Sequence, residues 1–90
     1  MYEVVPSGRF RKDYRLAVKR GYNMDLLETV VDQLAEGKEL DKRHRDHVLS
    51  GNYDGIRECH ITPDWLLLYD INEEELELLL LRTGSHSDIF

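Results

Sequence analysis

Cysteine and long apolar runs are scarce in this chain of 90 residues. Its single cysteine, Cys59, cannot form a disulfide within the chain, which is typical of a protein kept in a reducing compartment. No apolar run approaches the roughly 18 residues that would suggest a membrane span. The first residues lack the basic start and the apolar stretch of a secretory signal peptide. We therefore expect a cytoplasmic protein with no membrane segment.

Repeats, low-complexity segments and domain linkers are also missing. Ninety residues with 41% hydrophobic content suit one domain, because a single core of this size suffices without disulfides or a structural metal. Several enzyme motifs are absent: the sequence has no glycine-rich phosphate loop, no Cys-x-x-Cys or His-x-x-x-His pair, and no discernible Ser-His-Asp arrangement. We expect a single domain over residues 1–90.

Positive charge is scarce in the second half of the chain. The net charge is −6. Residues 1–45 carry 10 Lys and Arg against 8 Asp and Glu, whereas residues 46–90 carry 2 against 10. An acidic chain argues against general attraction to nucleic acid, although a local basic patch can still bind a few phosphates. One predicted helix carries either such a patch or an ordinary solvated face, made of Arg11, Lys12, Arg15 and Lys19.

The apolar spacing predicts a strand, two helices and three further strands. Ser7 and Asn23 are placed to cap the helices, and two helices with a short connection form a hairpin that covers a sheet. The polar segment 38–54 is interpreted as a surface loop. The predicted fold class is α+β, with an N-terminal strand, a two-helix hairpin and then antiparallel strands packed as one sheet. The strands are expected at 2–5, 56–61, 65–71 and 76–83, and the helices at 8–20 and 24–36.

The strand that begins at Trp65 is expected to be buried on both faces, because residues 65–69 are too apolar for a loop and too short for a helix. Alternation along the last strand places Arg82 in line with Leu78 and Leu80. Cys59, in the preceding strand, is expected to be a small buried apolar residue.

Chemically useful side chains gather at the ends of these strands. Pro63 interrupts the pairing, and the resulting turn is expected to hold His60, Asp64 and Trp65 close together. Antiparallel pairing of the last two strands would bring Arg82 and His86 alongside them. The 38–54 loop would add His47.

These residue types fit RNA cleavage without a metal. Such cleavage deprotonates a 2′-hydroxyl and protonates the leaving 5′-oxygen, which suits histidine, while arginine binds phosphate and tryptophan can hold an unstacked base. Alternatives remain open from the residues alone: a surface histidine, a core tryptophan and an ion-paired arginine. A zinc site made by the histidines and Asp64 is a further alternative, but the spacing is unfavourable, and we predict no metal and no cofactor.

Three segments together resemble YafQ-type toxins of the RelE/ParE superfamily. They are the runs Asp-His-Val-Leu-Ser-Gly at 46–51, Gly-Ile-Arg-Glu-Cys-His-Ile-Thr-Pro-Asp-Trp-Leu-Leu-Leu-Tyr at 55–69, and Arg-Thr-Gly-Ser-His-Ser-Asp-Ile-Phe at 82–90. The order strand, helix, helix, three strands is also similar to the fold of that superfamily and spans nearly the whole chain.

The resemblance implies a toxin of a type II toxin–antitoxin system. Such a toxin is an endoribonuclease that cleaves mRNA in the ribosomal A site, and a DinJ-like antitoxin neutralises it and carries the operator-DNA contacts of the complex. By matching motif, the acid–base residues would be His47, His60, Asp64 and His86. Arg82 would bind phosphate, and Trp65 and Phe90 would position the nucleotide.

Two other functions stay open within the superfamily. One is a ParE-like toxin that acts on gyrase by binding, and the other is a catalytically inactive module that only binds an antitoxin. Histidines at three matched positions favour cleavage. Family toxins tend to be basic, and the net charge of −6 departs from that pattern.

Overall fold

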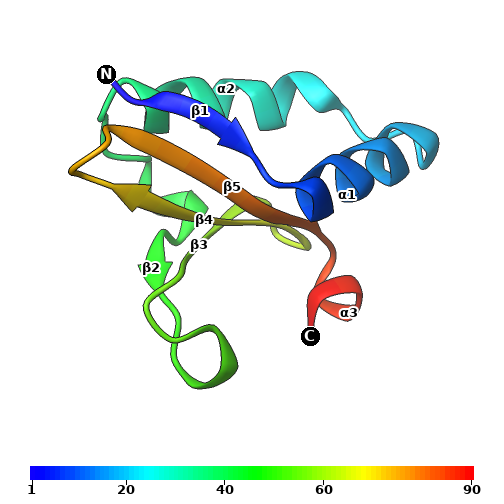
Figure 1. Ribbon diagram of the computed structural model, residues 1–90. Coiled ribbons are helices and arrows are strands. Elements are labelled where there is room, and N and C mark those ends of the chain that lie inside the picture. The colour runs from blue at the N-terminus through cyan, green and yellow to red at the C-terminus, as the bar shows by residue number, and fades with distance from the viewer.

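The computed structural model describes all 90 residues as a five-stranded sheet with two helices on one face (Figure 1). The sheet order is β1-β5-β4-β3-β2. β3, β4 and β5 pair antiparallel, as predicted, and β1 joins the edge parallel to β5. The predicted α+β class is thus confirmed, with a mixed sheet. The elements are β1 (Glu3–Pro6), α1 (Gly8–Lys19), α2 (Met24–Ala35), η1 (Lys42–His44), β2 (His47–Val48), η2 (Gly51–Tyr53), β3 (Arg57–Thr62), β4 (Trp65–Asn72), β5 (Glu77–Gly84) and α3 (His86–Ile89).

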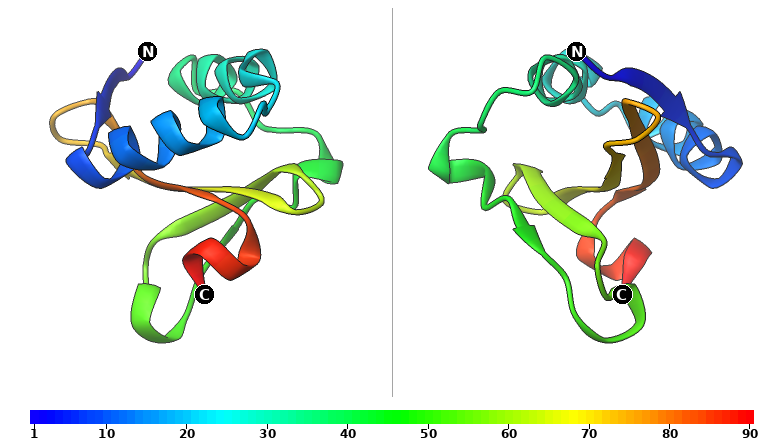
Figure 2. Two further views of the ribbon diagram at one scale, coloured as in Figure 1. Left: turned by 90° about the vertical axis from the view of Figure 1, so that its right-hand side faces the viewer. Right: turned by 60° about the vertical axis from the view of Figure 1, so that its left-hand side comes forward.

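Both long helices begin at the predicted caps. The hydroxyl of Ser7 accepts a hydrogen bond from the Phe10 amide, and the side-chain oxygen of Asn23 accepts one from the Asp25 amide. These contacts satisfy amides that lack partners within the first helical turn. Figure 2 shows the two helices side by side on one side of the sheet, with α3 on the other. The apolar sides of α1 and α2 supply Phe10, Ala17, Leu27, Val30, Val31, Leu34 and Ala35 to the main core.

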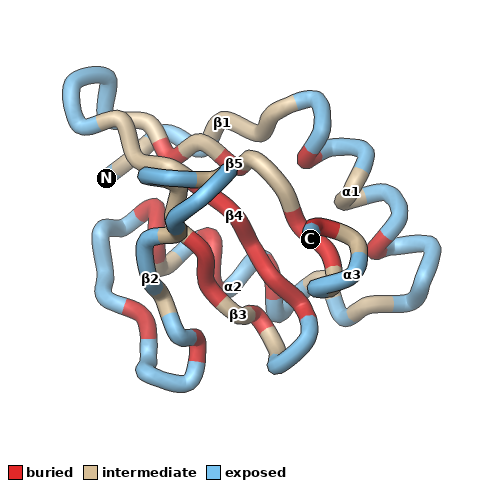
Figure 3. The backbone as a smooth tube through the Cα atoms, turned by 90° about the horizontal axis from the view of Figure 1, so that it is seen from below, coloured by how far each residue is buried: buried red, intermediate tan, exposed pale blue.

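β4 runs through the middle of the molecule, and residues 65–69 are all buried (Figure 3). Its side chains alternate between two clusters. Trp65, Leu67 and Tyr69 belong to the main core under the helices, whereas Leu66 and Leu68 pack with Ile89 of α3 on the other side. The expectation of a strand buried on both faces is confirmed, because α3 covers the face that the long helices do not.

A bulge in β5 makes the predicted alternation wrong beyond Leu80. Tyr69 pairs with Leu80, but Leu68 pairs with Arg82, so one extra residue lies between the two pairs. Such an insertion reverses the faces of all later residues in a strand. Thr83 therefore lies on the face covered by α1 and α2, which we call the helix-covered face. Arg82 lies on the opposite face, on which only the short α3 packs and which we call the open face.

The segment 38–54, predicted as a loop, contains two 3₁₀ turns and the short edge strand β2. β2 pairs antiparallel with β3, with His47 opposite Glu58 and Val48 opposite Arg57. The sequence did not predict this strand, because the surrounding segment is polar and rich in turn residues. No helix in the chain has the length and apolar character needed to cross a membrane.

Candidate active site

Two rows of side chains cross the open face of the sheet. Residues that pair across strands point to the same side, and so do residues two apart within a strand. The register therefore places four residues in one row: His47, Glu58, Leu68 and Arg82. The next row contains His60, Leu66 and Gly84. Four strands thus contribute to one surface, and α3 continues directly from it.

A buried carboxylate connects two of the predicted histidines. The side chain of Glu58 is only 6% exposed, and its Oε1 lies 3.5 Å from Nε2 of His47 and 3.4 Å from Nε2 of His60. The Nδ1 of His47 faces the carbonyl of Arg45. Both nitrogens of His47 therefore face acceptor groups. We call this set the Glu58 group.

Sequence reasoning missed Glu58. The signal was present, because Glu58 and His60 are two residues apart in a predicted strand and must share a face. The importance of that face became visible only with β2, which brings His47 opposite Glu58.

A second carboxylate holds the third histidine. Nδ1 of His86 lies 2.6 Å from Oδ1 of Asp64, and the backbone amide of His86 donates to the same oxygen at 3.1 Å. The hydrogen bond from the His86 ring lowers the pKa of Asp64. Both side chains are exposed, at 52% for His86 and 72% for Asp64. We call this pair the Asp64 group.

The two groups adjoin through their histidines. The ring centroids of His60 and His86 are 5.5 Å apart, and the rings meet edge to face at 63°. The expectation that antiparallel pairing brings His60, Asp64 and His86 together thus agrees with the geometry.

Several contacts fix α3, which carries His86. Ser85 and Asp88 form a capping box, in which each side chain accepts a hydrogen bond from the other residue's amide. Arg20, at the C-terminal cap of α1, donates twice to Asp88, at 2.6 and 3.2 Å, and this contact lowers the pKa of the Asp88 carboxyl. Ile89 packs on Leu66 and Leu68. Although α3 has only four residues, it is attached to both a helix and the sheet.

A polar network positions β2 and therefore His47. The hydroxyl of Tyr69 donates to Asp46 at 2.6 Å, and Arg57 contacts both Asp46 and Tyr69. Burial and the bond to Asp46 raise the pKa of Tyr69. Nearby, Nδ1 of the buried His44 lies 2.6 Å from the backbone oxygen of His60, which attaches η1 to β3.

Arg82, the predicted phosphate ligand, is held by α1. Its Nε and Nη2 donate to Asp13 at 2.8 and 3.3 Å, and the bond to Asp13 raises the pKa of the guanidinium. Asp13 also accepts from the amide of Thr83. Only Nη1 of Arg82 is not used by Asp13. Sequence reasoning did not identify Asp13 as this partner.

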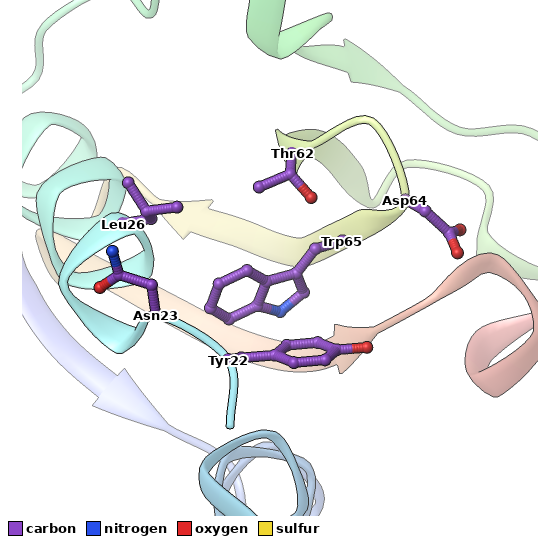
Figure 4. A pocket seen from close by; sticks show the side chains of 6 residues that line it. All are labelled: Tyr22, Asn23, Leu26, Thr62, Asp64 and Trp65. Atoms are coloured by element: carbon purple, nitrogen blue, oxygen red, sulfur yellow. The ribbon is translucent and has the colours of Figure 1, made fainter. Parts of the chain in front are cut away.

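Trp65 and Phe90, the predicted nucleotide-positioning residues, differ in accessibility. Phe90 is 61% exposed, and its ring meets that of Tyr53 edge to face at 5.7 Å. Trp65 is 4% exposed, and its Nε1 donates to the hydroxyl of Thr83 at 2.8 Å. Because Trp65 lies on the helix-covered face and His60 on the open face, the expected meeting of Trp65 with His60 is wrong, although Trp65 and Asp64 line one pocket. Its remaining surface lines a pocket beside α2 (Figure 4).

No set of three or more His, Cys, Asp or Glu side chains has an arrangement suited to a metal ion. Cys59 is fully buried, as expected of a small apolar residue, and burial raises the pKa of its thiol.

A sequence model described as "Bacterial toxin of type II toxin-antitoxin system, YafQ" matches residues 2–90. The chain belongs to this toxin family. The mRNA interferase toxin YafQ of Escherichia coli K12 is 35% identical over 85 residues, a match that covers 93% of this chain and 90% of that protein. The resemblance inferred from the three sequence segments is therefore confirmed, and the name of this relative supports the predicted class of enzyme, an endoribonuclease.

Solved structures of bacterial toxins share the fold throughout. A metal-bound toxin from Helicobacter pylori is 42% identical, with a TM-score of 0.94 and full coverage of both chains. YafQ from E. coli BL21(DE3) is 32% identical with a TM-score of 0.92, covering all of this chain and 99% of that one. The toxin in an E. coli DinJ–YafQ complex is 33% identical with a TM-score of 0.90 and the same coverage.

Proposed function

We propose that this YafQ-family toxin cleaves mRNA on the ribosome by acid–base catalysis with its own side chains, without a catalytic metal. The observation that carries the proposal is the pairing of His60 and His86. Their ring centroids lie 5.5 Å apart, each ring faces a carboxylate, and the side chains are 12% exposed for His60 and 52% for His86. Two imidazoles at this separation can reach the two oxygens that exchange protons when a 2′-hydroxyl displaces a 5′-oxygen at phosphorus.

His86 is the proposed general base. When Nδ1 of a histidine donates to a carboxylate, the lone pair lies on Nε2, which can then accept a proton. Asp64 makes this contact at 2.6 Å and leaves Nε2 of His86 free in an exposed position. Nε2 would take the proton from the attacking 2′-hydroxyl.

His60 is the proposed general acid. Its Nε2 faces Glu58, so Nδ1 is the nitrogen left for the substrate. In the protonated ring, Nδ1 donates a proton to the leaving 5′-oxygen. His47, whose two nitrogens both face acceptors, would support Glu58 from the other side and complete the set predicted to be catalytic.

Arg82 and Phe90 are proposed to bind the substrate. Arg82 is in the same row as Glu58, with β4 between their strands. At the usual strand spacing, the backbones of the two residues are about 10 Å apart. Asp13 fixes the plane of the guanidinium, and we propose that Nη1, which does not contact Asp13, binds a phosphate oxygen. Phe90 offers an exposed ring next to this surface for stacking on a base.

The ribosome would present the mRNA to a chain that is too acidic to attract free RNA. A net charge of −6 disfavours capture of free RNA, so the mRNA has to be presented by another particle. Arg11, Lys12, Arg15 and Lys19 of α1 are all exposed. We propose that this basic side of α1 contacts ribosomal RNA.

The proposed protein partner is a DinJ-like antitoxin in the cytoplasm. Support comes from the DinJ–YafQ complexes, whose matches cover 100% and 99% of this chain. Operator DNA would be bound by the antitoxin, because this chain itself is acidic.

The direct test combines purified toxin with ribosomes that translate a defined mRNA. Ribosomes need Mg²⁺, so the assay uses a chelator that removes transition metals and leaves Mg²⁺ in place. We expect cleavage at the same sites and rate with and without the chelator. Loss of cleavage with the chelator, and its return on adding zinc or copper, would contradict the metal-free mechanism; the metal-bound H. pylori relative makes this comparison necessary.

The same assay separates the other functions. Gyrase-dependent toxicity with intact mRNA would indicate ParE-like action. Tight antitoxin binding without cleavage or toxicity would indicate an inactive binding module, since a fold survives the loss of its activity.

A further inference from the structure

We propose that the pocket formed by Tyr22, Asn23, Leu26, Thr62, Asp64 and Trp65 binds one base of the mRNA, next to the phosphodiester that is cleaved. We call it the base pocket. The inference rests on the proposed ribonuclease function and adds to it a site for reading sequence. None of the predicted roles includes Tyr22, Asn23, Leu26 or Thr62.

The base pocket is continuous with the Asp64 group. Asp64 lines the pocket and also holds His86 through Nδ1. Figure 4 shows the Asp64 carboxylate at one end of the pocket, pointing away from α2 and toward the last helix. A nucleotide whose phosphate lies at His86 can therefore place a neighbouring base on the other side of the β3–β4 turn.

The size and walls of the base pocket suit a flat heterocycle. Its volume is about 300 Å³, enough for a purine or a pyrimidine. Tyr22, Leu26 and Trp65 form apolar walls, and aromatic walls of this kind hold unstacked bases in single-stranded RNA sites. The rings of Tyr22 and Trp65 support each other edge to face at 4.8 Å, so the wall is already in place without a ligand.

Polar groups at the pocket can distinguish one base from another. The side-chain oxygen of Asn23 is used to cap α2, which leaves its amide nitrogen as a hydrogen-bond donor. The hydroxyl of Thr62 can donate or accept. The Asn23 amide and the Thr62 hydroxyl together can therefore select a base by the donors and acceptors on its edge. A base without matching donors and acceptors would leave one of these polar groups unpaired.

Trp65 makes a direct binding test possible, because it is the only tryptophan in the chain. The four nucleoside 5′-monophosphates are titrated into the toxin while tryptophan fluorescence is followed. We expect one or two of them to change the signal in a saturable way. An antitoxin peptide is titrated in the same way. If none of the four nucleotides changes the fluorescence, or if only the peptide does, the pocket does not bind a base and the proposal is overturned.

Asn23→Asp is the informative variant. It keeps the oxygen that caps α2, removes the amide donor and adds a charge. Asn72→Asp is the matched control, because Asn72 caps a turn in the distant β4–β5 hairpin through the same type of oxygen. We expect Asn23→Asp to weaken nucleotide binding by about tenfold, in line with the loss of one hydrogen bond, and Asn72→Asp to leave it unchanged. Equal affinities in both variants would contradict the proposal.

Cleavage on the ribosome gives the second measurement. Cut sites are mapped on a mixed mRNA pool for the wild type, Asn23→Asp, Thr62→Val and Asn72→Asp. We expect the two pocket variants to change the preferred nucleotide at one position beside the cut, and the control to retain it. An unchanged preference in both pocket variants would overturn the proposal. If the wild type does not cleave while the fluorescence titration succeeds, the ribonuclease proposal fails and base binding stands.

Discussion

The two histidine–carboxylate groups of this site differ in almost every physical respect. Glu58 lies in a central strand, is 6% exposed and sits between two histidines at 3.4 and 3.5 Å. Asp64 lies in a turn, is 72% exposed and makes one short contact of 2.6 Å to one histidine. The Glu58 group is part of the sheet, whereas the Asp64 group depends on where a short C-terminal helix is attached.

This difference indicates a division of labour. A buried carboxylate with fixed neighbours keeps ring orientations constant, and its loss leaves polar groups unpaired inside the protein. An exposed pair is screened by water and contributes little to stability, but it can open and close around a substrate. We therefore expect changes in the Glu58 group to affect catalysis through geometry, and changes in the Asp64 group to affect it through the position of α3.

Removal of either ring that faces the substrate has the largest expected effect. His60→Ala and His86→Ala should each lower the rate of mRNA cleavage by about 10²–10⁴-fold, the usual contribution of a positioned acid or base. Circular dichroism should show both variants folded. Cleavage that persists in both would contradict the assignment of the two groups as a catalytic site.

Removal of the shared carboxylate comes next. Glu58→Ala should lower kcat by about 10²-fold with little change in KM, because the rings of His47 and His60 lose their common acceptor. Glu58→Gln should recover part of this loss, since its side-chain oxygen still accepts a hydrogen bond. Glu74→Ala, at the exposed hairpin, is the control. A change in KM alone would indicate that Glu58 acts on substrate binding instead.

A glycine substitution should disturb the Asp64 group while sparing the other. A Cβ at Gly84, where φ is +157°, would lie 3.0 Å from the Cβ and Oδ2 of Asp88, which caps α3. Gly84→Ala should shift α3, lower stability by about 1–3 kcal/mol and reduce cleavage. Gly8→Ala is the matched control, because nothing lies within 4 Å of its new atom. In NMR spectra, ring signals of His86 should move and those of His47 should not; movement of both sets of signals would show that the two groups are coupled.

The pH response of Asp64 is the smallest expected effect. Because the folded-state pKa of Asp64 is lowered from 3.8, the contact with His86 contributes stability above that value and loses it as the pH falls through the lowered pKa. An NMR titration of the Asp64 carboxyl should give a midpoint below 3.8, and His86→Ala should move it back toward 3.8. If the midpoint is the same in the wild type and in His86→Ala, the hydrogen bond from His86 does not stabilise the ionised Asp64 carboxylate.

The parts of the structure set by local pattern could be predicted, and those set by register could not. The caps Ser7 and Asn23 and the double burial of β4 follow from side chains that act within a few residues. The face on which Arg82 and Trp65 lie depends on one inserted residue in β5 and one turn after β3, which apolar alternation does not reveal. Glu58 was missed for the same reason: its importance depends on β2, which is only two residues long and exposed.

The division between acid and base is tested most directly with an mRNA in which sulfur replaces the 5′-bridging oxygen at the cut site. A thiolate leaves without being protonated, so this substrate does not require a general acid. The account predicts that His60→Ala regains near wild-type cleavage on the sulfur substrate, while His86→Ala stays impaired because the 2′-hydroxyl still needs a base. Rescue of His86→Ala instead, or of neither variant, would contradict it.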